Sequence, residues 1–404
     1  MRSTPPTSRR ALSSIALAAP LLLAACGGGE ETTPTPVDPC AAMVSECLVT
    51  QKACVNDSSG PHCAACPEGK FAASSGACAP IEGQAYTHDF TELSVAVGEE
   101  VLNKCQSWTL NNPEEIWFNA VELVQDVASH HSNWIFVPDN VFPGPDGVWN
   151  CKDRNYSQLT GALAGGVLYA QSTQAAKEVQ KFPNGAAVRI PPYSRIISDI
   201  HLLNVSDTPV KGHARLSIYG LPAADVKIKL TPFHLSYDGL NIPPHAVSRF
   251  VGECNVSEKF PGAVGAPFGM KIYYALPHTH ALATRFFIDT LGGPSDGTSI
   301  LDVAGFNGEA RGRAYDPPID MKGALGFRFG CEFENPRSQS VGWGFGDQEM
   351  CEVLGFAESR AGFESTVDTA TPKDADGKTQ VFTGDCSTIA FQWDHDKEGG
   401  PGPK

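Results

Sequence analysis

The chain has 404 residues and a formal net charge of −15, with 45 acidic and 30 basic side chains. This length predicts two or three folded units, at roughly 100–200 residues for each. Phosphate binding needs a basic face, and no cluster of Lys and Arg follows residue 10, so we expect no nucleic-acid partner.

Residues 1–25 predict a signal peptide. A basic start precedes an apolar run at 11–23 that is too short to cross a bilayer as a helix. The run ends in LAAC, which resembles a bacterial lipoprotein cleavage site with a lipid on Cys26. The alternative is an ordinary secretory signal in which Cys26 is incidental. We expect an exported protein, anchored by lipid at the bacterial cell envelope, on the outer membrane or the periplasmic face.

Residues 26–39 predict a flexible tether, because they have nothing to bury. The next segment, 40–80, is poor in apolar residues and holds six cysteines: Cys40, Cys47, Cys54, Cys63, Cys66 and Cys78. Cross-links would replace a hydrophobic core in so small a unit. Its CAACPEG turn resembles epidermal-growth-factor-like repeats, and such a module could bind a protein partner. A zinc knuckle is the alternative, but exported cysteines oxidise.

Twelve cysteines remain when Cys26 is set aside, and this even number allows up to six disulfides in an exported chain. Six of them lie beyond residue 80: Cys105, Cys151, Cys254, Cys331, Cys351 and Cys386.

From residue 84 onward, Gly and Pro separate short runs rich in Val, Ile, Phe and Tyr. These runs are 93–97, 187–190, 195–205, 215–221, 271–276 and 285–291. Helical periodicity is limited to 173–182 and 113–124, and the second segment could equally be a strand. The pattern predicts an all-β fold. We expect two tandem antiparallel β-sandwich or jelly-roll domains, at 84–222 and 231–396, before a disordered tail at 397–404.

The segment ALPHTHA places His278 and His280 two residues apart. In a strand they would stand side by side on one face, where two neutral imidazoles make half of a metal site. The alternative is a polar strand face that happens to carry histidine.

Three further positions could supply ligands. His130 and His131 are adjacent, so on a regular strand they would face opposite ways and could share a metal only at a bulge or a strand end. His201 is a single histidine in an apolar strand, where a buried structural histidine is the alternative. Met350, in GDQEMC, offers a thioether, a soft ligand that selects Cu(I).

In this order and spacing, HH, H, HTH and EMC resemble the copper type II, ascorbate-dependent monooxygenases. These are relatives of peptidylglycine α-hydroxylating and dopamine β-monooxygenase, and the resemblance covers residues 84–396. It implies two copper ions per chain, with ascorbate or a similar reductant as co-substrate. It also implies hydroxylation by O2 of an activated C–H bond in a small organic molecule.

The resemblance assigns the ligands as two sets. His130, His131 and His201 would hold the copper that stores and delivers an electron. His278, His280 and Met350 would hold the copper at which O2 reacts, and they would be the catalytic residues. The resemblance also implies three disulfides: Cys105–Cys151, Cys254–Cys386 and Cys331–Cys351.

The substrate positions depart from the family pattern. Peptide-amidating members carry an arginine two residues before HTH and a tyrosine four residues after the methionine, where this chain has Leu276 and Leu354. We therefore expect a less charged substrate than a glycine-extended peptide. Ser132 stands where the animal enzymes carry methionine. Asp199, on the strand face of His201, is a candidate to orient that imidazole.

Two other classes of function compete with the monooxygenase. One is a non-catalytic copper-binding or electron-transfer lipoprotein built on the same sandwiches. The other is a surface interaction protein in which the cysteine-rich module binds a partner and the metal sites are relics. Ligand residues alone do not distinguish turnover from binding.

Overall fold

The computed structural model describes residues 38–126, 128–373 and 375–393, and the side chains of His130 and His131 lie outside this description. The predicted signal peptide, the lipidation site Cys26, the tether up to residue 37 and the tail also lie outside it. Among the described residues, no helix is both long and apolar enough to cross a membrane.

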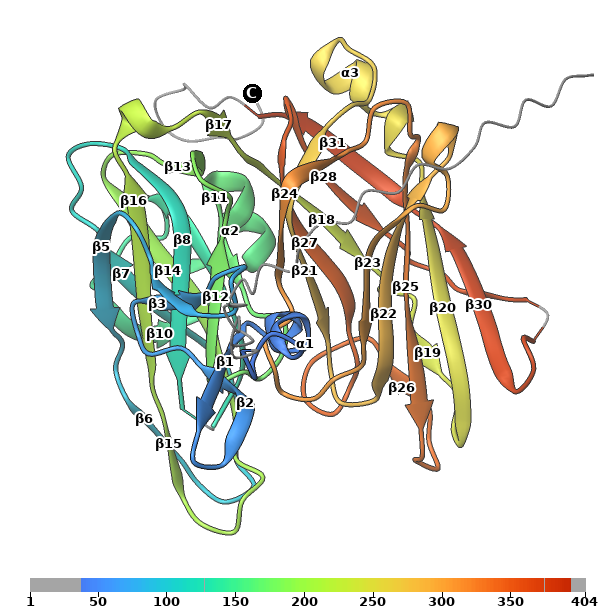
Figure 1. The fold of residues 1–404 in the computed structure, drawn as a ribbon, viewed down its shortest axis with the longest axis horizontal. Coiled ribbons are helices and arrows are strands. Elements are labelled where there is room, and N and C mark those ends of the chain that lie inside the picture. The colour runs from blue at the N-terminus through green and yellow to red at the C-terminus, as the bar shows by residue number, and fades with distance from the viewer. Residues whose placement is uncertain (1–37, 127, 374, 394–404) are drawn as a thin grey trace, which may run out of the picture. The chain divides into compact units, whose positions relative to one another are not determined.

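Strands form most of the regular structure, so the predicted all-β class is confirmed (Figure 1). Each of the six apolar runs that predicted strands lies on one. The described residues from 39 onward belong to one compact unit. The extents proposed for two separate domains, 84–222 and 231–396, therefore stay a prediction.

Two large sheets come from residues 84–229, and we call them the N-terminal sheets. One has the order β10-β7-β14-β9-β11, with β7 (Glu100–Thr109), β9 (Ser129–Pro138), β10 (Gly147–Asn150), β11 (Gly166–Ala170) and β14 (Ser194–Leu203). The other has the order β17-β13-β8-β16-β5, with β5 (Gln84–Asp89), β8 (Ile116–Gln125), β13 (Ala186–Ile190), β16 (Ala214–Leu221) and β17 (Ile228–Lys229), and β12 (Lys177–Lys181) also pairs with β8. Phe118 of β8 and Trp134 of β9 are among the buried side chains that fill the core.

Two further sheets come from residues 231–392, and we call them the C-terminal sheets. One has the order β24-β21-β27-β18-β28-β31, with β18 (Thr231–Ser236), β21 (Lys271–Thr279), β24 (Arg313–Asp320), β27 (Cys351–Glu358), β28 (Ala361–Thr366) and β31 (Ser387–Gln392). The other has the order β23-β22-β25-β20-β30-β29, with β20 (Ala246–Cys254), β22 (Ala283–Leu291), β23 (Ser299–Ala304), β25 (Gly326–Asn335), β29 (Thr371–Pro372) and β30 (Thr379–Asp385). Phenylalanines dominate the core, among them Phe233, Phe250 and Phe329.

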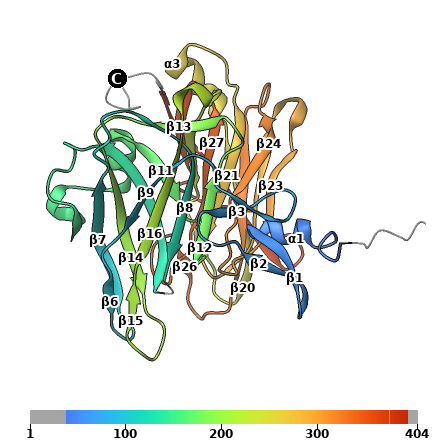
Figure 2. The same cartoon turned by 60° about the vertical axis from the view of Figure 1, so that its left-hand side comes forward.

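The remaining elements are short. Paired strands outside the large sheets are β1 (Lys52–Asp57) with β2 (Gly60–Ala65), β3 (Lys70–Ala72) with β4 (Cys78–Pro80), β6 (Leu93–Val95) with β15 (Val210–Gly212), and β19 (Asn241–Ile242) with β26 (Val341–Gly342). The helices are α1 (Val44–Val49), α2 (Gln158–Ala164) and α3 (Phe260–Val264), with 3-10 turns η1 (Cys151–Arg154), η2 (Ala223–Asp225), η3 (Val256–Glu258) and η4 (Gly293–Ser295) (Figure 2).

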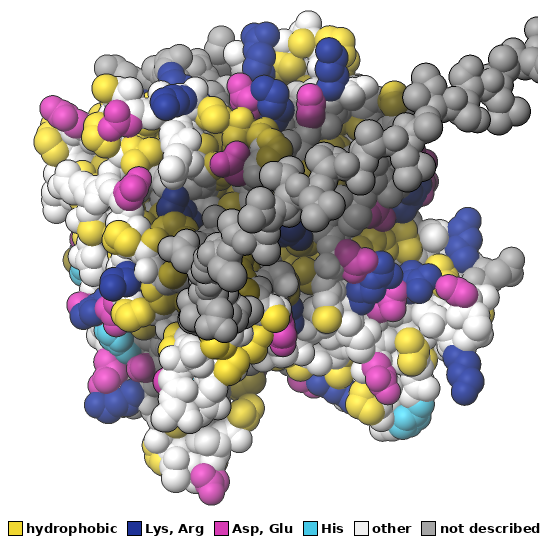
Figure 3. All heavy atoms as spheres, viewed as in Figure 1, with side chains coloured by type: hydrophobic (Ala, Val, Ile, Leu, Met, Phe, Trp, Pro, Cys, Tyr) yellow, Lys and Arg dark blue, Asp and Glu magenta, His cyan; other side chains and the backbone are white. Residues whose placement is uncertain are grey.

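Strand pairing in the described sheets is antiparallel except for β13–β17, β18–β28 and β20–β30. Parallel neighbours need a long crossover connection. The chain between β18 and β28 includes most of both C-terminal sheets, and this supplies the connection. On the face drawn in Figure 3, acidic and basic side chains are interspersed.

The predicted helix at 173–182 is wrong. Residues 177–181 form β12, which pairs with β8 in register from Lys177–Val124 to Lys181–Ala120. Glu178, Val179 and Gln180 are all buried, so their sheet and side-chain contacts override the helical preference of the segment. The second helical candidate, 113–124, could equally be a strand from its sequence, and residues 116–125 do form strand β8.

Six disulfides link the described cysteines. Three lie in the cysteine-rich module: Cys40–Cys54, Cys47–Cys63 and Cys66–Cys78. The other three are the pairs that the family resemblance implies: Cys105–Cys151, Cys254–Cys386 and Cys331–Cys351.

The N-terminal and C-terminal sheets share a hydrophobic core. Phe182 packs its ring against Phe356 of β27, with centroids 4.9 Å apart, and against Tyr274 of β21 at 5.8 Å. Leu276 and Leu354 belong to the same buried cluster. Aromatic contacts of this kind stabilise beyond the area that they bury, so they hold the sheets together.

A buried carboxylate joins the two sets of sheets beside this core. Glu178 accepts hydrogen bonds from Ser172 Oγ at 2.7 Å and Ser172 N at 3.0 Å. The same hydroxyl oxygen accepts from Arg311 N at 2.8 Å. Burial raises the pKa of Glu178 to about 7, although the hydrogen bonds from Ser172 oppose the rise.

The pH dependence of stability follows from this raised pKa. The folded state binds the Glu178 proton more tightly than the unfolded state, so its contribution to stability is present below about pH 4.5 and is lost as pH rises through about 7. The free energy of unfolding should therefore fall more in the wild type than in Glu178→Gln between pH 4.5 and 8, by at most about 3 kcal/mol. Urea unfolding across pH measures this. The exposed Glu114→Gln is the control, and equal slopes in all three proteins would contradict the prediction.

Candidate metal centre

His278 and His280 lie at the end of β21, and both imidazoles are buried, with 7% and 5% of each residue exposed. This end of β21 pairs with β27: His278 lies opposite Glu352, and Thr279 lies opposite Cys351. The alternation along the strand brings both rings together, with centroids 5.2 Å apart.

Hydrogen bonds define which nitrogen of each ring can bind a metal. His278 Nδ1 lies 2.9 Å from the carbonyl oxygen of Gln171, and His280 Nδ1 lies 2.8 Å from that of Gln348. A carbonyl oxygen only accepts, so each Nδ1 carries the proton and each Nε2 keeps the lone pair. Metal-binding histidines usually have such a partner on the second nitrogen.

Both rings are held neutral, as metal ligands must be. Burial, with a smaller effect of the neighbouring His278, lowers the pKa of His280 to about 4. Burial also lowers the pKa of His278, against an opposing effect of Glu352.

Met350 immediately precedes β27 and is buried. The register that pairs Thr279 with Cys351 makes His280 and Met350 the next opposed residues beyond the ends of the two strands. The disulfide from Cys351 to Cys331 of β25 ties down the backbone next to the methionine.

Glu349 is a residue of this centre that the sequence analysis missed. Its buried carboxylate accepts from His280 N at 3.1 Å and from Leu282 N at 2.7 Å. Burial raises the pKa of Glu349 to about 7, and these backbone hydrogen bonds oppose the rise. Glu349 thus joins the HTH segment to the segment that carries Met350. Its only signal in the sequence is its place beside the methionine.

A cavity of about 50 Å³ adjoins the two imidazoles. Thr173, Phe306 and Arg337 are among the residues that line it with the histidines. A single water needs about 10–15 Å³ of such volume, so a metal ion with a few small ligands fits. Two imidazole nitrogens with lone pairs, together with a thioether, would be a donor set that suits Cu(I) chemically.

Glu352, which lies opposite His278 on β27, belongs to a group of three charged residues with His234 and Glu364. Glu352 lies 3.6 Å from His234 Nε2, and Glu364 lies 3.9 Å from His234 Nδ1. Burial alone would lower the pKa of His234, but the two carboxylates raise it to about 10. Burial alone would raise the pKa of Glu352, but His234 lowers it to about 2. An ionised carboxylate therefore faces His278 near neutral pH.

His201 lies on β14 and is buried. Its Nε2 lies 2.8 Å from a carboxylate oxygen of Glu100, so Nε2 carries the proton of this hydrogen bond. Burial lowers the pKa of His201, and Glu100 opposes this effect. Asp199, the candidate from the sequence, instead accepts from Gln158 of α2 at 2.7 Å. Glu100 therefore orients this imidazole.

His130 and His131 lie on β9, beside His201. The register pairs His201 with His131 and then Leu202 with Ser129, so His130 is the extra residue of a β-bulge. A bulge is the condition under which adjacent histidines could turn to one side. Their side chains lie outside the described part of the chain.

The described histidines of the two predicted sets lie near one another. Phe345, on the segment before Met350, packs edge-on against His201 with ring centroids 5.8 Å apart. The charge of His278 lowers the pKa of His201, and that of His201 lowers the pKa of His280.

Within residues 38–126, 128–373 and 375–393, no three His, Cys, Asp or Glu side chains are grouped as metal ligands. The predicted set of His278, His280 and Met350 contains only two side chains of these types, since its third member is a methionine.

Leu276 and Leu354 stand at the substrate positions of the family resemblance, but their surroundings are those of core residues. Leu276 and Leu354 are buried in the core shared by the two sets of sheets, against residues such as Phe182. They therefore serve packing, and their apolar character carries no information about the substrate. Ser132 accepts a hydrogen bond from Trp134 Nε1 at 2.9 Å.

No family model and no curated protein matches this chain. Solved structures that align with it include the major capsid protein P2 from bacteriophage PM2, at 8% identity and a TM-score of 0.25 over 68% of this chain and 97% of that chain. Cowpea mosaic virus empty particles align at 11% identity and a TM-score of 0.26, over 67% and 89%. PBSX exported protein XepA aligns at 9% and 0.19, over 76% and 98%. At such scores these likenesses carry no argument.

Removal of the Glu349 carboxylate should destabilise the centre without any metal present. Glu349→Ala leaves two buried backbone N–H groups without their acceptor, which should cost about 2–4 kcal/mol of unfolding free energy. Glu349→Gln keeps one acceptor oxygen and should lose less. Urea unfolding of metal-free protein measures both. Glu358→Ala, which removes an exposed ion pair with Lys271, is the control and should change stability by less than about 1 kcal/mol. Equal effects of Glu349→Ala and Glu358→Ala would contradict the role of Glu349.

Proposed function

We propose that this protein is a copper-dependent monooxygenase that hydroxylates an activated C–H bond of a small organic substrate. The observation that carries the proposal is the pair His278 and His280, with each Nδ1 proton held by a carbonyl and each Nε2 left as the ligand nitrogen. The register that pairs Thr279 with Cys351, continued by one residue on each strand, supports Met350 as a partner of His280. Imidazole and thioether together favour the reduced copper that reacts with O2.

The reaction consumes O2 and two one-electron equivalents from a reductant such as ascorbate. One oxygen atom enters the C–H bond to give an alcohol, and the other leaves as water with two protons. Bound copper would supply the one-electron redox chemistry. The chain itself would hold both imidazoles neutral, fix their orientation and limit the substrate to a small molecule through the size of the cavity.

A second copper would be bound through His201 in the N-terminal sheets. Glu100 holds the Nε2 proton of His201, so Nδ1 would be the ligand atom. His130 and His131 would complete the set, and the bulge at His130 supports this because it relaxes the strict alternation of side chains along β9.

Copper content and O2 uptake on the same samples test the proposal. After anaerobic loading with Cu(I), wild type should bind two coppers per chain and take up O2 with ascorbate. Met350→Leu should weaken one copper by at least about tenfold and abolish uptake, because it removes the thioether at similar volume. Met270→Leu, at a buried methionine of the C-terminal core, is the matched control and should behave as wild type.

Two results would contradict the proposal. Two tightly bound coppers without O2 uptake would favour a copper-binding or electron-transfer protein. One copper or none in the wild type would leave the histidines as buried structural side chains.

We further propose that the protein is exported and anchored to a membrane by a lipid on Cys26. Six disulfides support export, because such bonds persist in oxidising compartments. Cys26→Ser should move the protein from the membrane fraction to the soluble fraction of its native host. Mass spectrometry of the wild-type N-terminus should show the lipid. An unmodified Cys26 would contradict the anchor.

A further inference from the structure

The cysteine-rich module, residues 40–80, lies against the large sheets. Figures 1 and 2 both show β1 and β2 beside β12 and the C-terminal strands. Phe71 of the module and Ile81, the residue that follows the module in the chain, pack on the outer face of the N-terminal sheets. Their neighbours there are Ala120, Val179 and Tyr219. Strand β8 is therefore buried on both faces, as its nearly uninterrupted burial shows.

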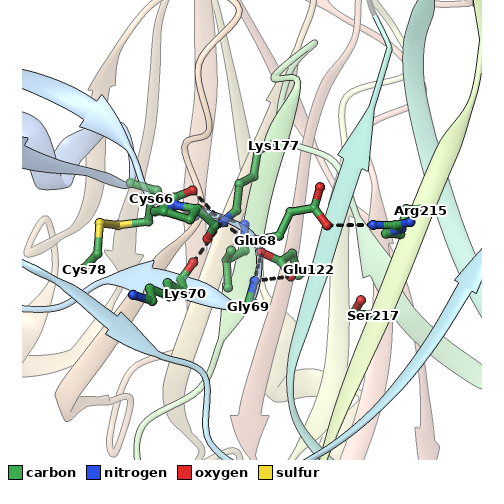
Figure 4. A network of polar contacts seen from close by, with 12 residues as sticks. Cys66, Glu68, Gly69, Lys70, Cys78, Glu122, Lys177, Arg215 and Ser217 are labelled. Atoms are coloured by element: carbon green, nitrogen blue, oxygen red, sulfur yellow. Dashed lines mark hydrogen bonds and ion pairs between the residues drawn. A yellow bond between two sulfur atoms is a disulfide. The ribbon is translucent and has the colours of Figure 1, made fainter.

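A buried ion pair anchors the module on this face (Figure 4). Glu122 of β8 is 2% exposed, and both of its carboxylate oxygens accept from Gly69 N at 3.0 Å. Lys177 Nζ lies 2.8 Å from Glu122. The same ammonium donates to three carbonyls of the module, those of Cys66, Pro67 and Lys70. Buried charges need such partners, so the outer face of β8 and β12 is complete only with the module in place.

The module also contacts the C-terminal sheets. Gln51 Oε1 accepts from Val179 N of β12 at 2.9 Å, and Gln51 Nε2 donates to Gly312 O at 3.0 Å. One side chain thus bridges the two sets of sheets. Next to it, Lys52 Nζ lies 2.5 Å from Glu309.

The segment reached by Gln51 and Lys52 forms part of the cavity wall. Phe306 lines the cavity beside His278, and the segment 305–312 continues from it. The connection between β11 and β12 also holds this segment, because Thr173 Oγ1 donates to Glu309 O at 2.8 Å and Ser172 Oγ accepts from Arg311 N at 2.8 Å. The module and the N-terminal part of the chain therefore both contact the segment.

We propose that the cysteine-rich module is an internal clamp that positions segment 305–312, and with it one wall of the His278 cavity, against the N-terminal sheets. The module acts on the chain's own fold and is a positioning element of the cavity. This inference does not depend on copper, and a failure of the copper experiment would leave it standing.

Hydrogen–deuterium exchange on the full-length, disulfide-intact, metal-free protein tests the clamp. Gln51→Met with Lys52→Met removes the polar contacts to Val179, Gly312 and Glu309 at similar side-chain volume. The amides of segment 305–312 should then exchange at least about tenfold faster, because the segment loses its contacts to the module. The amides of β25 should keep their wild-type rates.

A matched control is Asn56→Ala with Ser58→Ala at the exposed tip of the β1–β2 hairpin, which should leave segment 305–312 unchanged. Wild-type exchange in the Met double variant, or equal acceleration in the control, would overturn the proposal. If the double variant fails to fold, Gln51→Met alone replaces it, with an expected acceleration confined to residues 310–312. Wild-type rates in that single variant would likewise overturn the clamp.

Discussion

The candidate centre depends on one hydrogen bond between the two sets of sheets. His278 belongs to a C-terminal sheet, but the carbonyl that holds its Nδ1 proton belongs to Gln171, which follows β11 in the N-terminal sheets. If the sheets shifted apart, that carbonyl would be lost and the ring could rotate or change tautomer. The geometry of a ligand on one set of sheets is therefore set by packing against the other.

The contacts around Gln171 extend this constraint in two directions. Gln171 N donates to Ser132 O, on the residue after the HH pair, so a single peptide segment connects both predicted copper sites. Next in the chain, Ser172 is tied to Glu178 and to Arg311. The aromatic core around Phe182 supplies most of the adhesion between the sheets, and these polar contacts fix their register.

Several carboxylates are buried, and each has partners that offset the cost of its burial. Glu349 accepts from backbone N–H groups, Glu122 from a backbone N–H group and Lys177, and Glu352 lies next to a cationic His234. Breaking one of these contacts would leave a buried charge without its partner, which is costly. Carboxylates with such partners therefore hold neighbouring segments in place. The same chemistry thus supports the cavity, the module and the candidate metal ligands.

The sequence by itself determined the strands, the common face of His278 and His280, and the even set of cysteines. Short apolar runs rich in β-branched residues predict strands, and segment 195–205 shows this as β14, which is buried along nearly its whole length. At 173–182 the helical periodicity was misleading, because pairing with β8 outweighed it. Only the tertiary structure brought Gln171 and Glu100 to the imidazoles of His278 and His201, and Glu349 to the backbone of His280. Gln171 holds His278 through its backbone, 107 residues away in the chain, and a carbonyl carries no signature of residue type. Such partners are decided by how the sheets pack, which local periodicity does not encode.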